Sequence, residues 1–132
     1  MQRLVISGAL VAMAISMTGC SGGADNTAPA AAGTAFYRAI QMNQFDQACD
    51  LLAEQTRKKL GEPEKTDCPQ ALGSIGLSAS HVASVQTYGR KAMVQLDGDV
   101  AFLAQENNKW HITAAGCKEQ PDNPYDCEVE AN

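Results

Sequence analysis

Five cysteines are the residues of this chain with the most readable chemistry: Cys20, Cys49, Cys68, Cys117 and Cys127. A cysteine thiol can carry a lipid, pair into a disulfide or bind a metal ion. An odd number leaves at least one cysteine outside any set of disulfide pairs. Cys20 stands apart from the other four, because it directly follows an apolar run near the start of the chain.

Residues 1–19 have the pattern of an export signal. Arg3 gives a basic start, residues 4–17 form an apolar run, and Thr18 and Gly19 are small residues before Cys20. The run is shorter than the roughly 20 residues that a membrane-spanning helix needs. We therefore predict that residues 1–19 are a removed signal peptide.

The residues around the predicted cut indicate which kind of signal this is. Met17-Thr18-Gly19-Cys20 resembles the cleavage motif of bacterial lipoproteins, although Met17 stands where that motif usually has Leu. The resemblance implies that the Cys20 thiol carries a diacylglycerol and that cleavage falls before it. Two acyl chains give stable anchoring, so the expected location is the extracytoplasmic face of the cell membrane. The alternative is an ordinary signal in which Cys20 is incidental.

The other four cysteines form an even set, which export would place in an oxidising compartment where thiols pair. Four cysteines allow three connectivities. We favour Cys49–Cys68 and Cys117–Cys127, because both loops are local and neither crosses the domain.

The two histidines, His81 and His111, have no readable partners. Neither stands near a cysteine pair at ligand spacing and no CxxC is present, so we predict no metal site and no cofactor. His111 could serve as a general base in a cavity, but a surface strand histidine is the simpler interpretation. No G-x-S-x-G motif is present, and we predict no catalytic residue.

Three other patterns have simple structural interpretations. Asp97-Gly98-Asp99 lacks the further oxygen ligands of a calcium loop, so it indicates a hairpin turn. The segment 73–76 is too short for a phosphate loop. Four aromatic residues could line a ligand pocket, but in a chain with few aromatics a place in the core is favoured; they are Tyr37, Tyr88, Phe102 and Trp110.

The charge is moderately acidic. The net charge is −5, and it becomes −6 once Arg3 is removed. Beyond Arg57-Lys58-Lys59 the sequence has no cluster of Lys and Arg, which argues against nucleic acid as a partner and against a polybasic lipid-binding segment.

The remaining sequence predicts one domain behind a linker. Residues 21–33 contain no large apolar side chain, so we expect residues 20–33 to be a lipidated flexible tether and 34–132 to be a single domain. We predict a helix from Thr34 to about residue 42, an amphipathic helix from Phe45 to about residue 59, and a short helix over 66–73 capped by Thr66 or Asp67.

After Gly76 the pattern changes to alternating strands. We predict strands over 81–88, 90–96, 100–106, 109–115 and 125–129, with turns at Asp97-Gly98 and Asn107-Asn108. One apolar face would comprise Ala92, Val94, Leu96, Val100, Phe102, Ala104, Trp110, Ile112 and Ala114. The fold class is α+β, with N-terminal helices packed on one face of an antiparallel sheet of four to five strands.

This order of elements resembles the nuclear-transport-factor-2-like, cystatin-like cone. A closer resemblance covers most of the chain after residue 19, and it is to a group of small uncharacterised lipoproteins of actinobacteria. The resemblance implies no activity for any residue. It rests on Phe36-Tyr37, the segment 48–52, Cys68, Phe102-Leu103, the segment 110–117 and Pro124-Tyr125-Asp126-Cys127.

We therefore expect a lipid-anchored envelope lipoprotein that acts as a non-enzymatic binding or interaction module. Its partners would be the membrane, through Cys20, and either a small apolar ligand or another envelope protein. One alternative is a small cone-fold hydrolase or isomerase with His111, Asp99 or Tyr88 facing a cavity. Another is a purely structural envelope protein.

Overall fold

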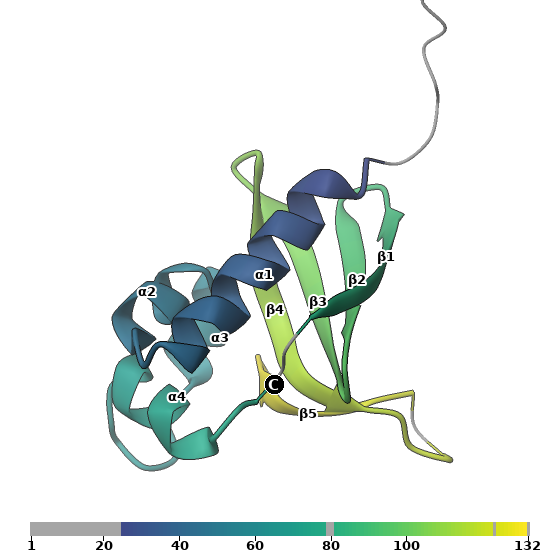
Figure 1. Cartoon of the computed structure of the whole chain (residues 1–132). Helices are drawn as coiled ribbons and strands as arrows, with labels where there is room; N and C mark the ends of the chain where they lie inside the picture. The colour runs from purple at the N-terminus through teal and green to yellow at the C-terminus, as the bar shows by residue number, and fades with distance from the viewer. Residues whose placement is uncertain (1–24, 79–80, 123, 132) are drawn as a thin grey trace, which may run out of the picture.

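The computed structural model describes residues 25–78, 81–122 and 124–131, so the predicted signal peptide and Cys20 lie outside the described residues. Four helices precede one five-stranded antiparallel sheet of strand order β1-β2-β3-β4-β5, which confirms the α+β class (Figure 1). The elements are α1 (Thr27–Gln41), α2 (Phe45–Asp50), α3 (Glu54–Lys59), α4 (Cys68–Ile75), β1 (Val82–Tyr88), β2 (Lys91–Leu96), β3 (Asp99–Glu106), β4 (Lys109–Lys118) and β5 (Asp126–Glu130).

Helix α1 begins at Thr27, well before the expected start of the domain at Thr34. Residues 27–33 therefore belong to the folded domain, and the prediction of a flexible tether over them was wrong. Alanine is the strongest helix former, and a proline in the first turn sacrifices no helical hydrogen bond. Gly33 allows close contact with the sheet, since a Cβ at this position would lie 3.2 Å from Val94 Cγ1. Small residues that cannot fill a core can thus still pack closely against one.

The predicted single helix from Phe45 is two short helices in the structure. Between them, Leu52 forms a parallel bridge with Ile112 of β4. The Ile112 N–H donates to the Leu51 oxygen at 2.8 Å, and the Ala53 N–H donates to the Ile112 oxygen at 2.7 Å. Strand β5 pairs with β4 only from Ala114 onward, so this break in the helix satisfies the part of the β4 edge that β5 leaves free.

Helix α4 follows the prediction closely. Asp67 is its N-cap, and its carboxylate accepts the N–H of Gln70 at 3.0 Å. Gly76 ends the helix in the left-handed conformation, with φ of 72°, which glycine adopts at little cost.

The sheet buries its core face against the helices, but the alternation in β3 differs from the prediction. Ala101 and Leu103 are buried, while Phe102 and Ala104 face away from the helices as half-buried residues. The two-residue turn pairs Leu96 with Asp99, so Asp99, Ala101 and Leu103 share the core face of β2. The irregular pairing between β3 and β4 instead inserts extra residues into β4, and an insertion of this kind moves the following side chains to the other face. Ala114 is likewise half-buried, and Ala115 takes the core position.

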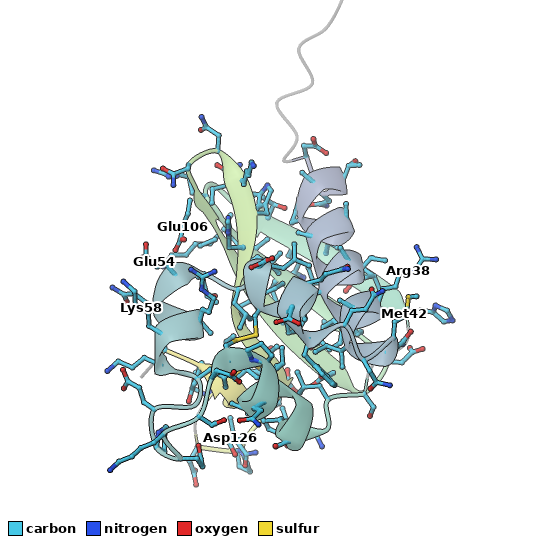
Figure 2. All side chains as sticks on the ribbon, turned by 90° about the vertical axis from the view of Figure 1, so that its left-hand side faces the viewer. Arg38, Met42, Glu54, Lys58, Glu106 and Asp126 are labelled. Atoms are coloured by element: carbon cyan, nitrogen blue, oxygen red, sulfur yellow. A yellow bond between two sulfur atoms is a disulfide. The ribbon has the colours of Figure 1, made fainter. Side chains whose placement is uncertain are left out.

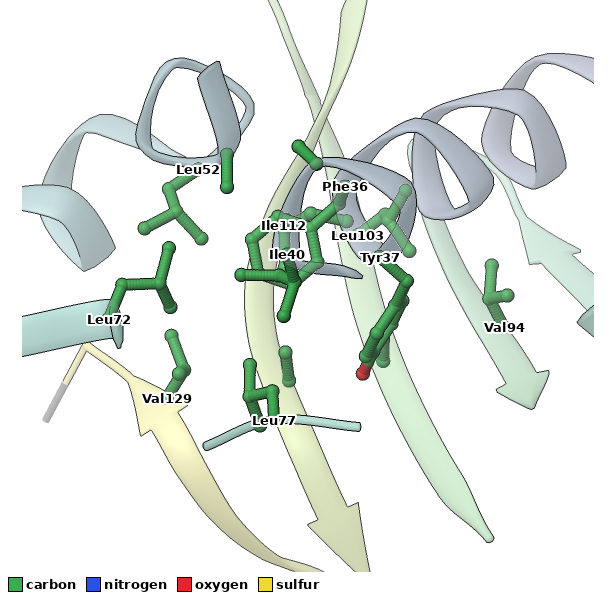
Figure 3. Close-up of a cluster of buried hydrophobic side chains, with 14 of the residues drawn as sticks. Phe36, Tyr37, Ile40, Leu52, Leu72, Leu77, Val94, Leu103, Ile112 and Val129 are labelled. Carbon is green, nitrogen blue, oxygen red and sulfur yellow. The ribbon is translucent and has the colours of Figure 1, made fainter. Parts of the chain in front are cut away.

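The core lies between α1 and the sheet and continues under α2 and α4 (Figure 3). Phe36, Tyr37 and Ile40 project from α1 onto Leu103 and Ile112. Phe36 and Tyr37 meet edge to face, with ring centroids 5.2 Å apart.

Two disulfides fix the ends of this core. Cys49 of α2 is bonded to Cys68 of α4, and Cys117 of β4 is bonded to Cys127 of β5. This is the pairing that the local-loop argument favours. Cys49 lies on the buried face of α2, as its helical position predicts.

Candidate functional site

A buried hydrogen-bonded pair of polar side chains connects α1 to the turn between β2 and β3. Tyr37 is 1% exposed and Asp99 is 7% exposed, and the Tyr37 hydroxyl donates to Asp99 Oδ2 at 2.9 Å. The same hydroxyl oxygen accepts the N–H of Gly116 at 3.4 Å. Figure 3 shows the Tyr37 oxygen at the margin of the apolar cluster. One phenol therefore joins the helix, the β2–β3 turn and β4.

Asp99 is also part of the wall of a polar pocket at this end of the sheet. The pocket has a volume of about 240 Å³. Four chain segments meet there: the loop after α4, the β2–β3 turn, the end of β4 and the facing part of β5. Its lining is Gly76, Leu77, Ser78, Asp97, Gly98, Asp99, Gly116, Lys118 and Glu128.

Glycine at position 116 is required for the shape of this pocket. Gly116 has a φ of 66°, and a Cβ there would lie 2.7 Å from Leu77 Cδ2 and 3.2 Å from Glu128 Cβ. This backbone conformation also lets the Gly116 N–H donate to the Tyr37 hydroxyl oxygen. The left-handed backbone of Gly116 therefore supports both the pocket wall and the buried hydrogen bond.

The electrostatics of the pocket favour hydrogen-bond donors as ligands. Burial is the main cause that raises the pKa of Asp99 above its ordinary value of 3.8, while the hydrogen bonds from Tyr37 and from the Val100 backbone oppose the rise. Burial and the nearby Asp99 charge raise the pKa of Tyr37, so this phenol stays protonated as a donor. The lining has three carboxyl groups and a single lysine.

The other candidates from the sequence do not converge on this pocket. His111 is half-buried on β4, and its Nδ1 is buried without a hydrogen-bond partner. His81 is exposed just before β1. Tyr88 is 64% exposed, Phe102 stacks edge to face with Tyr125 on the outer sheet face, and Trp110 is partly buried against the core.

Sequence reasoning identified Asp97-Gly98-Asp99 as a turn, and the structure confirms it, with a φ of 81° at Gly98. It missed the pairing of Asp99 with Tyr37, which are 62 residues apart. Tyr37 is one of the residues on the apolar face of a helix, and that pattern gives no sign of a buried carboxyl partner. Only the register of α1 against the sheet could reveal it.

Across the described residues, no group of three or more potential metal-binding side chains is present, and no helix is long and apolar enough to cross a membrane. Comparison with family models, with curated proteins and with solved structures finds no match.

Proposed function

We propose that this protein is a lipid-anchored binding module of the cell envelope, held by Cys20, whose ligand site is the Asp99 pocket. The observation that carries the proposal is a nearly buried carboxyl group at the wall of a polar pocket. A carboxyl whose pKa is perturbed by burial inside a cleft is a physical signature of functional sites.

The chemistry of the pocket changes the expected ligand from apolar to polar. Asp97, Asp99 and Glu128 offer acceptor oxygens, and Lys118 adds one donor. A small ligand, or the end of a chain, that carries a positive charge or several N–H groups would complement this lining. Its volume of about 240 Å³ suits a group smaller than the drug-sized ligands that fill pockets of ~300–1,000 Å³.

The anchor and the fold relationship are parts of the same proposal. The motif at residues 17–20 supports lipidation, and the paired state of the other four cysteines is consistent with an oxidising compartment. The packing of α1 across β1 to β4 is what a cystatin-like cone would require. On this proposal the chain is similar to the actinobacterial lipoproteins.

A second candidate function is hydrolysis or isomerisation, and one observation favours it. Asp99 has a raised pKa and lies beside a pocket, and a general acid–base needs a pKa shifted toward the operating pH. Asp99 rather than His111 would be the reacting group, because His111 is not in the pocket lining.

Native mass spectrometry of the full chain, extracted gently from membranes, tests the ligand site. The pocket variant is Asp99→Asn with Glu128→Gln, which removes two charges and keeps the side-chain shapes. The matched control is Glu62→Gln with Glu64→Gln, an equal charge change at two exposed positions after α3. We expect a bound small molecule of constant mass on the wild type and the control, and its loss from the pocket variant.

Identical unliganded masses for all three proteins over several preparations would contradict a small-molecule site. Turnover of the identified molecule would separate the two candidate functions. A binding module leaves it unchanged, whereas an enzyme consumes it and loses that activity in Asp99→Asn.

A further inference from the structure

The chain enters the folded domain at the end of the sheet opposite the Asp99 pocket. Asn26 precedes α1, and its Oδ1 accepts the hydroxyl hydrogen of Thr87 at 2.6 Å, next to the β1–β2 turn. In Figure 1 the start of α1, the β1–β2 turn and the β3–β4 turn lie at the upper end of the molecule, and the β2–β3 turn lies at the lower end. We call this end, formed by the start of α1, the β1–β2 turn and the β3–β4 turn, the tether end.

Three exposed cations gather at the tether end. Arg90 lies in the β1–β2 turn, Lys91 is the first residue of β2, and Lys109 is the first residue of β4 after the β3–β4 turn. The two turns are joined, because Arg90 Nη2 donates to the Gln105 oxygen at 3.1 Å and the Gln105 N–H donates to the Arg90 oxygen at 2.9 Å. Lys109 is 18 positions after Lys91 and 19 after Arg90 in the chain. The sequence alone therefore does not show that these three cations share one surface.

Asp25 and Glu106 are acidic residues of the same end. Asp25 accepts the N–H of Thr27 at the start of α1. Glu106 faces Lys109 across the β3–β4 pair and lies beside Glu54, whose N–H it accepts at 3.5 Å (Figure 2). Three cations against these two acids leave the tether end with a small excess of positive charge. The opposite end carries the three carboxyl groups of the pocket against Lys118, so the net charge of −5 is unevenly distributed.

We propose that Arg90, Lys91 and Lys109 rest against the anionic head groups of the membrane that holds Cys20, so that the Asp99 pocket faces away from that membrane. This inference rests on the lipid anchor of the proposed function. Only residues 21–25 separate Cys20 from Asn26, and fully extended they reach at most about 20 Å.

A short tether makes a weak attraction sufficient. It holds the tether end near the lipid at an effective concentration in the millimolar range or above. Each Lys or Arg close to an anionic surface favours contact about fivefold. Asp25 and Glu106 at the same end oppose the three cations, so the net shift is well below the ~100-fold that three unopposed cations would give.

Trp110 reports on this contact, because it is the only tryptophan of the chain and directly follows Lys109. The full chain, purified from membranes, is reconstituted in vesicles that contain lipids with a nitroxide on the head group. The vesicles are either wholly zwitterionic or contain one third phosphatidylglycerol. We expect strong quenching of Trp110 only with phosphatidylglycerol, and its loss in 1 M salt, where the Debye length falls to about 3 Å.

The test variant is Arg90→Gln/Lys91→Gln/Lys109→Gln. Its matched control is Lys58→Gln/Lys59→Gln/Lys65→Gln, which removes the same charge from exposed positions around α3. Quenching should disappear in the test variant and persist in the control. Equal quenching in both variants, quenching that is independent of phosphatidylglycerol, or none in the wild type would overturn the inference.

The intact mass of the same preparation separates this inference from the anchor itself. If Cys20 carries no lipid, the proposed anchor fails. The Cys20 thiol, the one cysteine outside the two disulfides, is then coupled to a maleimide lipid and the quenching is measured on that product. If Cys20 is lipidated and the quenching pattern is absent, only the inference about the tether end fails.

Discussion

Replacing Tyr37 by phenylalanine removes one oxygen atom and takes one hydrogen-bond partner away from each of two buried groups. Asp99 Oδ2 loses the donor at 2.9 Å, and the Gly116 N–H loses its acceptor at 3.4 Å. A hydrogen bond to a charged group contributes about 1.5–3 kcal/mol, and an unsatisfied buried group costs about 1–3 kcal/mol. The long Gly116 contact adds little, so we expect the free energy of unfolding to fall by about 2–3 kcal/mol at pH 7.

The loss should depend on pH in a defined direction. The Tyr37 hydroxyl stabilises the ionised form of Asp99, so the loss is largest where Asp99 is charged. Once Asp99 is protonated, at or below its ordinary pKa of 3.8, the bond lost is an ordinary neutral one of about 1 kcal/mol. Urea unfolding followed by circular dichroism at pH 7 and pH 3.5 measures both values.

Tyr125→Phe is the matched control. Its hydroxyl donates to Met93 Sδ at 3.5 Å and to Glu119 at 3.4 Å, on a more accessible surface, and its removal should cost under about 0.5 kcal/mol. Equal losses in the two variants, or a Tyr37→Phe loss that grows as the pH falls, would refute the assigned role of the buried pair.

Three further predictions concern the same domain. Because burial raises the pKa of Asp99 in the folded state, the contribution of Asp99 to stability should fall as the pH rises from 3.8 through that raised value. The difference in free energy of unfolding between the wild type and Asp99→Asn, from urea titrations, should change in that direction over this range, and a constant difference would contradict the prediction. Gly116→Ala should lower the melting temperature clearly more than Gly89→Ala, because both glycines have positive φ but only the first would place a Cβ against other atoms; equal shifts would count against the pocket packing. Replacing Cys49 and Cys68 together by alanine should lower the free energy of unfolding by about 3 kcal/mol, because the unfolded chain loses a cross-link between residues 19 positions apart. An unfolding curve like that of the wild type would show that this disulfide does not form.

Strand positions were predictable from the sequence because turn chemistry and alternation are local signals. The turn at Asp97-Gly98 and the turn at Asn107-Asn108 set strand ends within a few residues of those observed. The core face of β3 follows from the two-residue turn, which pairs Leu96 with Asp99 and so puts Leu103 rather than Phe102 in the core. The face of β4 was not predictable, because its irregular pairing with β3 puts Ala115 rather than Ala114 in the core.

The helices show how tertiary contacts override local pattern. The apolar spacing from Phe45 onward is that of one amphipathic helix, but Ile112 of β4 recruits the Leu51 and Ala53 backbone to its edge. At the start of α1, the alanine-rich segment lacks large side chains, and its packing depends on how closely Gly33 can approach Val94.

The candidate site was the least predictable part, because its residues come from four separated segments. The cysteine pairing favoured from local loops matches the structure. The pocket next to Asp99 needs the register of α1, the β2–β3 turn and the left-handed Gly116 together. None of these three is visible in a window of sequence.

Native mass spectrometry of the chain extracted from membranes tests the central proposal most directly, since one spectrum reports both the anchor and the ligand. The account predicts a chain that starts at Cys20, carries a diacylglyceryl group and holds a small molecule that the Asp99→Asn/Glu128→Gln variant loses. A chain that retains residues 1–19, a Cys20 without lipid, or equal unliganded masses for the wild type and the variant would contradict it.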